Sequence, residues 1–246
     1  YNDINQLKKI IKKYKDIGII KMEVERNIKP KNNFLKKVRD LAKKNNIILI
    51  FDECTTGFRQ TYGGLHKEYS VEPDMIIYGK ALGNGYPITS ILGKRRIMQN
   101  AEKTFLSSTF WSERIGTNAA IATLKEMKRL DSANKIKNIG IKLKKRIIKI
   151  SNDTGLKIIL SGLDSMPSFK LKNSDENTQQ AFRMFITKEM LKKNFLATDT
   201  VYLSLAHNQK ILDKYLSNLK KIFLKFKKIE KVDIKNLPEK LFNRMN

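Results

Sequence analysis

Two short apolar runs, each followed by a chemically reactive residue, constrain the fold of this chain most strongly. Ile47–Phe51 contains five apolar residues, mostly β-branched or aliphatic, and is followed directly by Asp52. Met75–Tyr78 is a second apolar run, followed after one glycine by Lys80. Short runs of this kind are typical of buried parallel strands. Since ligands bind outside the carboxyl ends of strands in open α/β sheets, we expect Asp52 and Lys80 on one rim, facing one pocket.

The segments around these runs alternate between helical and strand patterns. Apolar residues recur at helical spacing in residues 4–14 and again in residues 34–42, whereas Ile19–Val24 has the pattern of a strand. The order helix, strand, helix, strand predicts a parallel α/β layer. Ile88–Leu92 is expected to add one more strand beside the previous one, and a helix is expected to begin near Ser112.

The pattern changes after residue 130, where a long predicted helix, Asp131–Ser151, is followed by short strands alternating with helices. We expect strands at Leu156–Leu160, Ser168–Leu171 and Val201–Leu205, and helices at Asn177–Lys193 and Gln209–Phe226. The last helix has the clearest apolar stripe of the chain. This order predicts a compact α+β layer, and residues 234–246 are expected to form a loosely held tail.

Three motifs, in a fixed order, carry a resemblance to a known family. They are FDECTTGFR at residues 51–59, PDMIIYGKALGNGYPI at residues 73–88 and SSTFWSERIGTNAA at residues 107–120. Together they resemble the class III aminotransferases, pyridoxal 5′-phosphate (PLP) enzymes of fold type I that include glutamate-1-semialdehyde aminomutase. The resemblance implies an α/β fold with two domains. Residues 1–130 would be the C-terminal part of the PLP-binding large domain, and residues 131–246 a small α+β C-terminal domain.

The resemblance also implies roles for four residues. Lys80 corresponds to the lysine that forms a Schiff base with PLP, and Asp52 to the acid that pairs with the pyridine nitrogen of the cofactor. Thr109 corresponds to a threonine that contacts the phosphate of the cofactor in a neighbouring subunit, which implies a homodimer. Cys54 falls where the family has a branched aliphatic residue under the cofactor ring, so we interpret it as an apolar packing residue rather than a nucleophile.

These roles agree with the chemistry of the side chains. A lysine is a nucleophile only as the neutral amine, a form that a partly buried site next to a cofactor favours. The carboxylate of Asp52 would keep the pyridine nitrogen protonated, so that the ring accepts the electron pair released when the substrate Cα loses its proton. Lys80, displaced by the incoming amine, would then be the base that carries this proton.

Each role has a simpler alternative. An ordinary solvated lysine, a turn residue and a helix N-cap are the alternatives for Lys80, Asp52 and Thr109 respectively. Lys80 stands between a strand and a glycine-rich turn, and Asp52 directly follows five apolar residues, so their settings favour the site. Both roles of Thr109 are compatible with each other. Glu53 is expected to be structural, pairing with neighbouring polar groups.

Composition limits the other classes of function. The single cysteine, Cys54, excludes an internal disulfide and a multi-cysteine zinc site, and neither His66 nor His207 has a partner at ligand spacing, so we expect no metal. No apolar run approaches the roughly 18 residues needed to span a bilayer, and no secretory signal opens the chain. We therefore expect a soluble, cytoplasmic protein without a membrane partner.

A net charge of +26, from 50 Lys and Arg against 24 Asp and Glu, raises the alternative of a nucleic-acid binder. The lysines, however, are spread over nearly every segment. The densest runs, Lys142–Arg146 and Lys220–Lys228, lie on predicted helices whose other face is apolar, which favours solvated helix faces over a specific site. A nucleic-acid binder would instead show steeply salt-dependent DNA binding.

The sequence therefore predicts a PLP-dependent aminotransferase that moves an amino group between an amino acid and a carbonyl compound, a ketone or an aldehyde. The segment SSTFWSERIG weakly favours sugar-related substrates. An aminomutase of the glutamate-1-semialdehyde type would use the same lysine and aspartate, so both reactions stay open. In the family, a phosphate loop and a ring-stacking aromatic residue precede the matched segment and have no counterpart here. We thus expect a piece of a longer protein, with a non-catalytic remnant as the alternative.

Overall fold

The computed structural model describes residues 1–25, 27–107, 109 and 112–228 of the 246-residue chain. The tail predicted at residues 234–246 lies outside them. The chain divides into two compact units, Tyr1–Lys137 and Asn138–Asn246. The boundary predicted after residue 130 stays a prediction. It falls between two helices, α4 (Arg114–Leu130) and α5 (Ser132–Thr154), whereas the division into units falls within α5.

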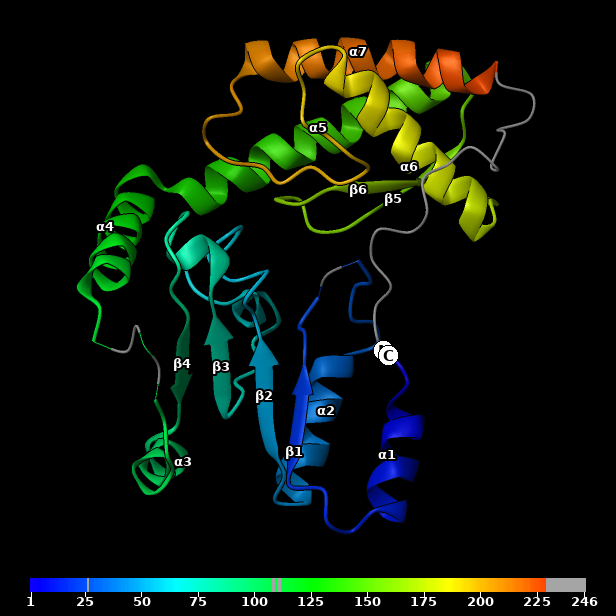
Figure 1. The fold of residues 1–246 in the computed structure, drawn as a ribbon. Helices are drawn as coiled ribbons and strands as arrows, with labels where there is room; N and C mark the ends of the chain where they lie inside the picture. Colours follow the sequence, from blue (N-terminus) through cyan, green and yellow to red (C-terminus); the bar gives the residue numbers. More distant parts are fainter. Residues whose placement is uncertain (26, 108, 110–111, 229–246) are drawn as a thin grey trace. The chain divides into compact units, whose positions relative to one another are not determined.

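The first unit is built on a four-stranded sheet with the order β1-β2-β3-β4, which can be followed in Figure 1. β1 (Ile19–Met22), β2 (Ile48–Asp52) and β3 (Met75–Tyr78) are parallel, and β4 (Ser90–Gly93) pairs antiparallel with β3. The remaining elements besides α4 are α1 (Ile4–Lys13), α2 (Phe34–Lys44), η1 (Leu65–Tyr69), η2 (Lys80–Leu82), α3 (Arg95–Met98) and η3 (Gln99–Lys103). The predicted parallel α/β layer and its additional strand are confirmed.

Burial along β2 alternates strictly between the two faces of the sheet. Leu49 and Phe51 are fully buried, on the face where α2 buries Leu35 and Val38 and contacts β2. Ile48, Ile50 and Asp52 are only partly buried. Successive side chains of a strand point to opposite faces, so Asp52 lies on the more open face of this sheet.

Asp74 connects three elements just before β3 begins. Its carboxylate, which is 2% exposed, accepts hydrogen bonds from Arg39 of α2 at 2.6 Å and from Lys94 next to β4 at 2.8 Å. It also accepts the Leu49 amide of β2 at 3.0 Å. Burial alone would raise the pKa of Asp74, but the hydrogen bonds from Leu49, Lys94 and Arg39 outweigh it and lower the pKa to about 2. Asp74 thus fixes the amino end of β3 against its neighbours.

Replacing Asp74 with asparagine should lower the free energy of unfolding by roughly 2–3 kcal/mol at pH 7. The folded-state pKa lies below its ordinary value of 3.8, so the carboxylate stabilises the fold fully above about pH 4. This stabilisation is lost as the pH falls toward 2. Urea unfolding should therefore show a difference between wild type and Asp74→Asn that shrinks between pH 7 and pH 3.

The exposed Asp16 supplies the matched control, since Asp16→Asn removes a carboxylate that is solvated. Its effect on the free energy of unfolding should be below about 0.5 kcal/mol at either pH. A loss of stability in Asp74→Asn that is equal at pH 7 and pH 3 would contradict the role of the ionised carboxylate.

The second unit combines a β-hairpin with helices, as the sequence predicts. β5 (Ile158–Ser161) pairs antiparallel with β6 (Ser168–Leu171), and α6 (Glu176–Leu191) and α7 (Gln209–Lys227) contribute most of the buried apolar residues together with α5. Three fully buried rings, Phe169, Phe182 and Phe223, pack at centroid distances of 5.8 to 6.3 Å. The α+β layer is thereby confirmed.

The strand predicted at Val201–Leu205 is wrong. Only one isolated bridge forms beside it, between Thr200 and Ser168. The amides of the segment donate to the carbonyls of Pro167 and Ser165 at 2.9 and 3.1 Å. Pro167 has no N–H group to return a hydrogen bond, so the segment lies beside the hairpin without forming a regular ladder.

Candidate active site

Asp52 and Lys80 leave the sheet at the same end. Asp52 is the last residue of β2, and Lys80 follows β3 after Gly79. β2 and β3 are parallel neighbours in a register that pairs Asp52 with Ile77, three residues before Lys80. The two charges interact, because the positive charge of Lys80 contributes to lowering the pKa of Asp52.

Lys80 has an unusual backbone and a side chain that is held at its tip. Its φ of 45° lies in the left-handed region, which is uncommon for a residue other than glycine. The side chain is exposed, and Nζ donates a hydrogen bond of 2.6 Å to Oγ1 of Thr55, which is 6% exposed. A buried hydroxyl on the neighbouring loop therefore orients the amine of Lys80.

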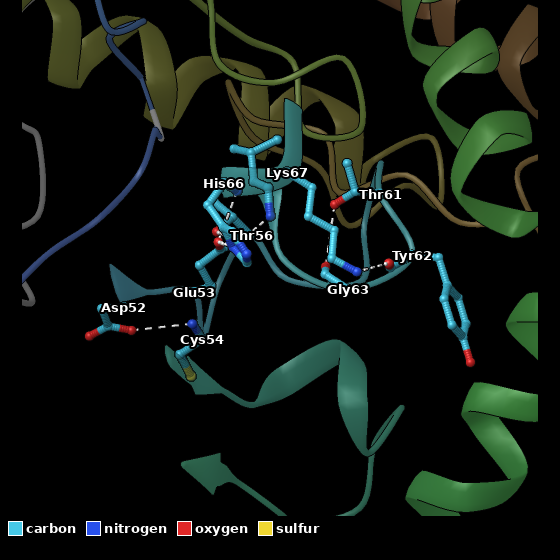
Figure 2. Close-up of polar contacts among 10 residues, drawn as sticks. Asp52, Glu53, Cys54, Thr56, Thr61, Tyr62, Gly63, His66 and Lys67 are labelled. Atoms are coloured by element: carbon cyan, nitrogen blue, oxygen red, sulfur yellow. Dashed lines mark hydrogen bonds and ion pairs between the residues drawn. The ribbon is translucent and has the colours of Figure 1, made fainter. Parts of the chain in front are cut away.

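Cys54 contacts both Asp52 and Gly79, the glycine that precedes Lys80. Its backbone amide donates to Oδ1 of Asp52 at 3.2 Å, a contact drawn in Figure 2. Its thiol packs against Gly79, where a Cβ atom would come within 2.7 Å of Sγ. Position 79 therefore requires glycine, and Cys54 acts on the site through its amide and its bulk.

Asp52 is held ionised by two donors of the chain. Lys21 of β1 forms a salt bridge to Oδ2 at 2.9 Å, and the Cys54 amide occupies Oδ1. Burial alone would raise the pKa of Asp52. The hydrogen bonds from Lys21 and Cys54 and the charges of Lys21 and Lys80 outweigh burial, so the pKa lies below its ordinary value.

Glu53, the neighbour of Asp52, has a different role. It is completely buried, and its carboxylate accepts hydrogen bonds from the amide of Leu65, the amide of His66 at 3.0 Å, Nδ1 of His66 at 2.6 Å and the hydroxyl of Thr56 at 3.3 Å. Figure 2 shows the side chain of Glu53 pointing toward His66, away from that of Asp52. The predicted structural role of Glu53 is confirmed: it closes the loop that carries Thr55.

Glu53→Ala should lower the free energy of unfolding by about 3 kcal/mol or more, since it leaves several buried donors without an acceptor. Urea unfolding measures this loss. Glu53→Gln keeps one carbonyl oxygen as acceptor and should be destabilised less. The exposed Glu72 provides the control, because Glu72→Ala should change the free energy by less than about 0.5 kcal/mol. Equal effects of the two alanine substitutions would refute the role of Glu53.

Thr109 lies in an exposed turn ahead of α4. Its interpretation as the N-cap of this helix is wrong. The cap is Glu113, whose carboxylate accepts hydrogen bonds from the amides of Ile115 and Gly116 at 2.5 and 3.0 Å. A longer acidic side chain placed next to the first turn reaches these amides directly. The phosphate contact of Thr109 stays a prediction.

Sequence reasoning missed Lys21, Thr55 and His66. The signal for Lys21 was its place as the one charged residue in the apolar run of β1, but its partner depends on the register between β1 and β2. Thr55 lies three residues after Asp52 in a loop without periodicity, so no pattern pointed to it. His66 has no partner nearby in sequence, because Glu53 lies 13 residues before it.

Comparison with known proteins decides the family. The family Aminotransferase class-III matches residues 27–222, which is more than half of the chain. The chain belongs to the class-III aminotransferases. This class-III aminotransferase chain is 34% identical over 205 residues to a 3-aminobutyryl-CoA aminotransferase from Cloacimonas acidaminovorans, covering 79% of the chain and 49% of that protein.

A second relative is a glutamate-1-semialdehyde 2,1-aminomutase from Nitrosopumilus maritimus, 32% identical over 88% of the chain and 56% of the relative. The class-III chain thus spans about half the length of the curated relatives it matches. Among solved structures, the FumI protein of Sphingopyxis sp. MTA144 superimposes with a TM-score of 0.84 at 22% identity, over 93% of this chain and 57% of FumI. An omega-transaminase from Sphaerobacter thermophilus gives 0.81 at 18% identity, over 91% and 56%. These structures confirm the fold type I architecture.

PLP is the cofactor of the class-III family, and the FumI structure holds it. The residues of this site fit the group. Asp52 offers a carboxylate that stays ionised, which suits a protonated ring nitrogen, and Lys80 offers an exposed amine, which suits an aldehyde. Cys54 contacts Asp52 through its amide and Gly79, the residue before Lys80, through its thiol.

Proposed function

We propose that this chain carries the lysine and the aspartate of a PLP-dependent aminotransferase that moves an amino group between an amino acid and a keto or aldehyde compound. The observation that supports this most is the placement of an amine, Lys80, and an ionised carboxylate, Asp52, at the carboxyl ends of two adjacent parallel strands. The relative from Cloacimonas acidaminovorans, itself named an aminotransferase, agrees with this reaction.

Each residue has a task in this reaction. The cofactor, when bound, supplies an aldehyde and a ring that accepts electrons. Asp52 would keep the pyridine nitrogen protonated through a charge-assisted hydrogen bond. Lys80 would hold the cofactor through its aldehyde, and its free amine would be the base that moves the proton of the substrate Cα. Thr55 orients Nζ of Lys80 for both tasks, and Cys54 would pack against the bound cofactor.

An aminomutase reaction is the second candidate. Two glutamate-1-semialdehyde 2,1-aminomutases, from Nitrosopumilus maritimus and Clostridium botulinum, match 88% and 90% of the chain at 32% and 30% identity. Lys80 and Asp52 would serve both reactions in the same way. The fate of the nitrogen separates them: an aminotransferase gives it to a second molecule, whereas an aminomutase returns it to the same one.

A homodimer completes the proposal. Thr109 is exposed on its turn and therefore accessible to a second chain. A closed two-fold interface would let each chain lend this hydroxyl to the cofactor phosphate of the other, so one self-complementary surface serves both sites.

Hydrogen exchange at the substrate Cα tests the proposed chemistry. In deuterated buffer with PLP and a panel of α- and β-amino acids, the protein should exchange the hydrogen on the carbon that bears the amine of one donor, as measured by mass spectrometry. Lys80→Ala should abolish the exchange. Asp52→Ala should slow it about 10²-fold or more, because the ring loses its electrostatic partner.

Lys67 supplies the control for this measurement, since it lies in η1 and its amine donates a hydrogen bond to the carbonyl of Tyr62. Lys67→Ala should exchange at nearly the wild-type rate. Absence of exchange in the wild type with every donor would contradict the proposed function, and a normal rate in Asp52→Ala would refute the role of the aspartate.

A further inference from the structure

Lys21 is a charged residue among apolar neighbours on the face of the sheet that carries Asp52. β1 and β2 are paired in parallel, with Ile19 opposite Ile48 and Lys21 opposite Ile50. Opposite residues share a face, so Lys21 stands on the same face as Ile50 and Asp52. Its neighbours on this face are isoleucines. Its Nζ forms an ion pair with Asp52, the candidate partner of the cofactor ring.

The two oxygens of Asp52 are held by donors of unequal mobility. Oδ1 accepts from the backbone amide of Cys54 at 3.2 Å, and this amide is fixed by the chain that follows β2. Oδ2 accepts from Nζ of Lys21 at 2.9 Å. The side chain of Lys21 is 56% exposed, against 27% for Asp52. The lysine is therefore the donor that can leave without moving the backbone.

A cofactor ring needs the same carboxylate. A protonated pyridine nitrogen must donate to an oxygen of Asp52, and Oδ2 is the one whose present partner can be displaced. If the ring used a second lone pair of Oδ2 instead, its positive charge would lie beside the ammonium group of Lys21, and like charges at such a distance repel. In either geometry, Lys21 opposes the binding of the protonated ring.

We propose that Lys21 is the counter-ion of Asp52 in the absence of cofactor, and that it competes with the cofactor ring for the carboxylate and so weakens cofactor binding. This inference rests on the proposed function, because it takes Asp52 as the partner of the ring nitrogen. The other charged or titratable groups that act on the pair are Lys80 near Asp52, and Glu23 and Cys54 near Lys21.

The first test needs no cofactor. The ¹³C signal of the Asp52 carboxyl carbon, titrated by NMR in the full chain, reports the pKa of this group directly. In Lys21→Met the pKa should rise, because the carboxylate loses its hydrogen bond and its nearest positive charge. Lys21→Arg should restore a pKa close to that of the wild type. Lys37→Met, which removes an exposed lysine of α2, is the control. An unchanged pKa in Lys21→Met overturns the pairing.

The second test measures affinity. Pyridoxine 5′-phosphate is the suitable probe, because it keeps the ring nitrogen and the phosphate but has no aldehyde to react with the many lysines of the chain. Titrated by ring fluorescence, Lys21→Met should bind it about two- to fivefold more tightly than wild type, the range expected for the loss of one partly exposed ion pair. Lys21→Arg and Lys37→Met should bind it like the wild type.

The outcomes separate the two proposals. Binding to Lys21→Met that is equal to or weaker than binding to wild type overturns the inference and leaves the proposed function standing. Combining Lys21→Met with Asp52→Asn should remove the gain, since the lysine acts through the carboxylate, and a gain that persists also overturns it. If neither the wild type nor any variant binds pyridoxine 5′-phosphate, the proposed function is contradicted, and so is the competition between Lys21 and the cofactor ring.

Discussion

The parallel pairing of β2 with β3 is the interaction on which the candidate site depends. Its ladder pairs Asp52 with Ile77 and continues to a hydrogen bond of 2.9 Å from the Glu53 amide to the Ile77 carbonyl. A slip of one residue would turn Asp52 to the face that α2 covers and would bring Glu53 to the open face. Asp74 fixes the other end of the same strand pair. The site therefore depends on the register of two short strands, which residues outside the site hold in place.

Asp52 and Glu53 have different roles because successive side chains at the end of a strand point to opposite faces of the sheet. Glu53 is completely buried and fixes the loop that reaches His66, whereas Asp52 stays partly exposed and ionised. The loop that Glu53 holds brings Thr55 within 2.6 Å of the Lys80 amine. The buried acid thus orients the lysine indirectly, while the partly exposed acid lies on the open face of the sheet.

The sequence predicts the parts of this arrangement that depend on local pattern. Asp52 and Lys80 stand out because each follows a short apolar run, and the position of strand ends is a local property. Lys21, Thr55 and His66 escape prediction because their partners are set by strand register or by a loop without periodicity. The strand expected at Val201–Leu205 does not form for a similar reason: its partner segment contains Pro167, which has no N–H group to donate. The N-cap of α4 is Glu113 rather than Thr109, because the side chain of Glu113 reaches the first amides of the helix.

The most direct test of the account is to find which lysine carries the cofactor. The protein, treated with PLP, reduced with borohydride and digested, should yield one principal peptide with a pyridoxyl group, and that group should be on Lys80. In Lys80→Ala this labelled peptide should disappear, while weak labelling of exposed lysines stays unchanged. A principal label on Lys67 or Lys94, with no label on Lys80, would contradict the account.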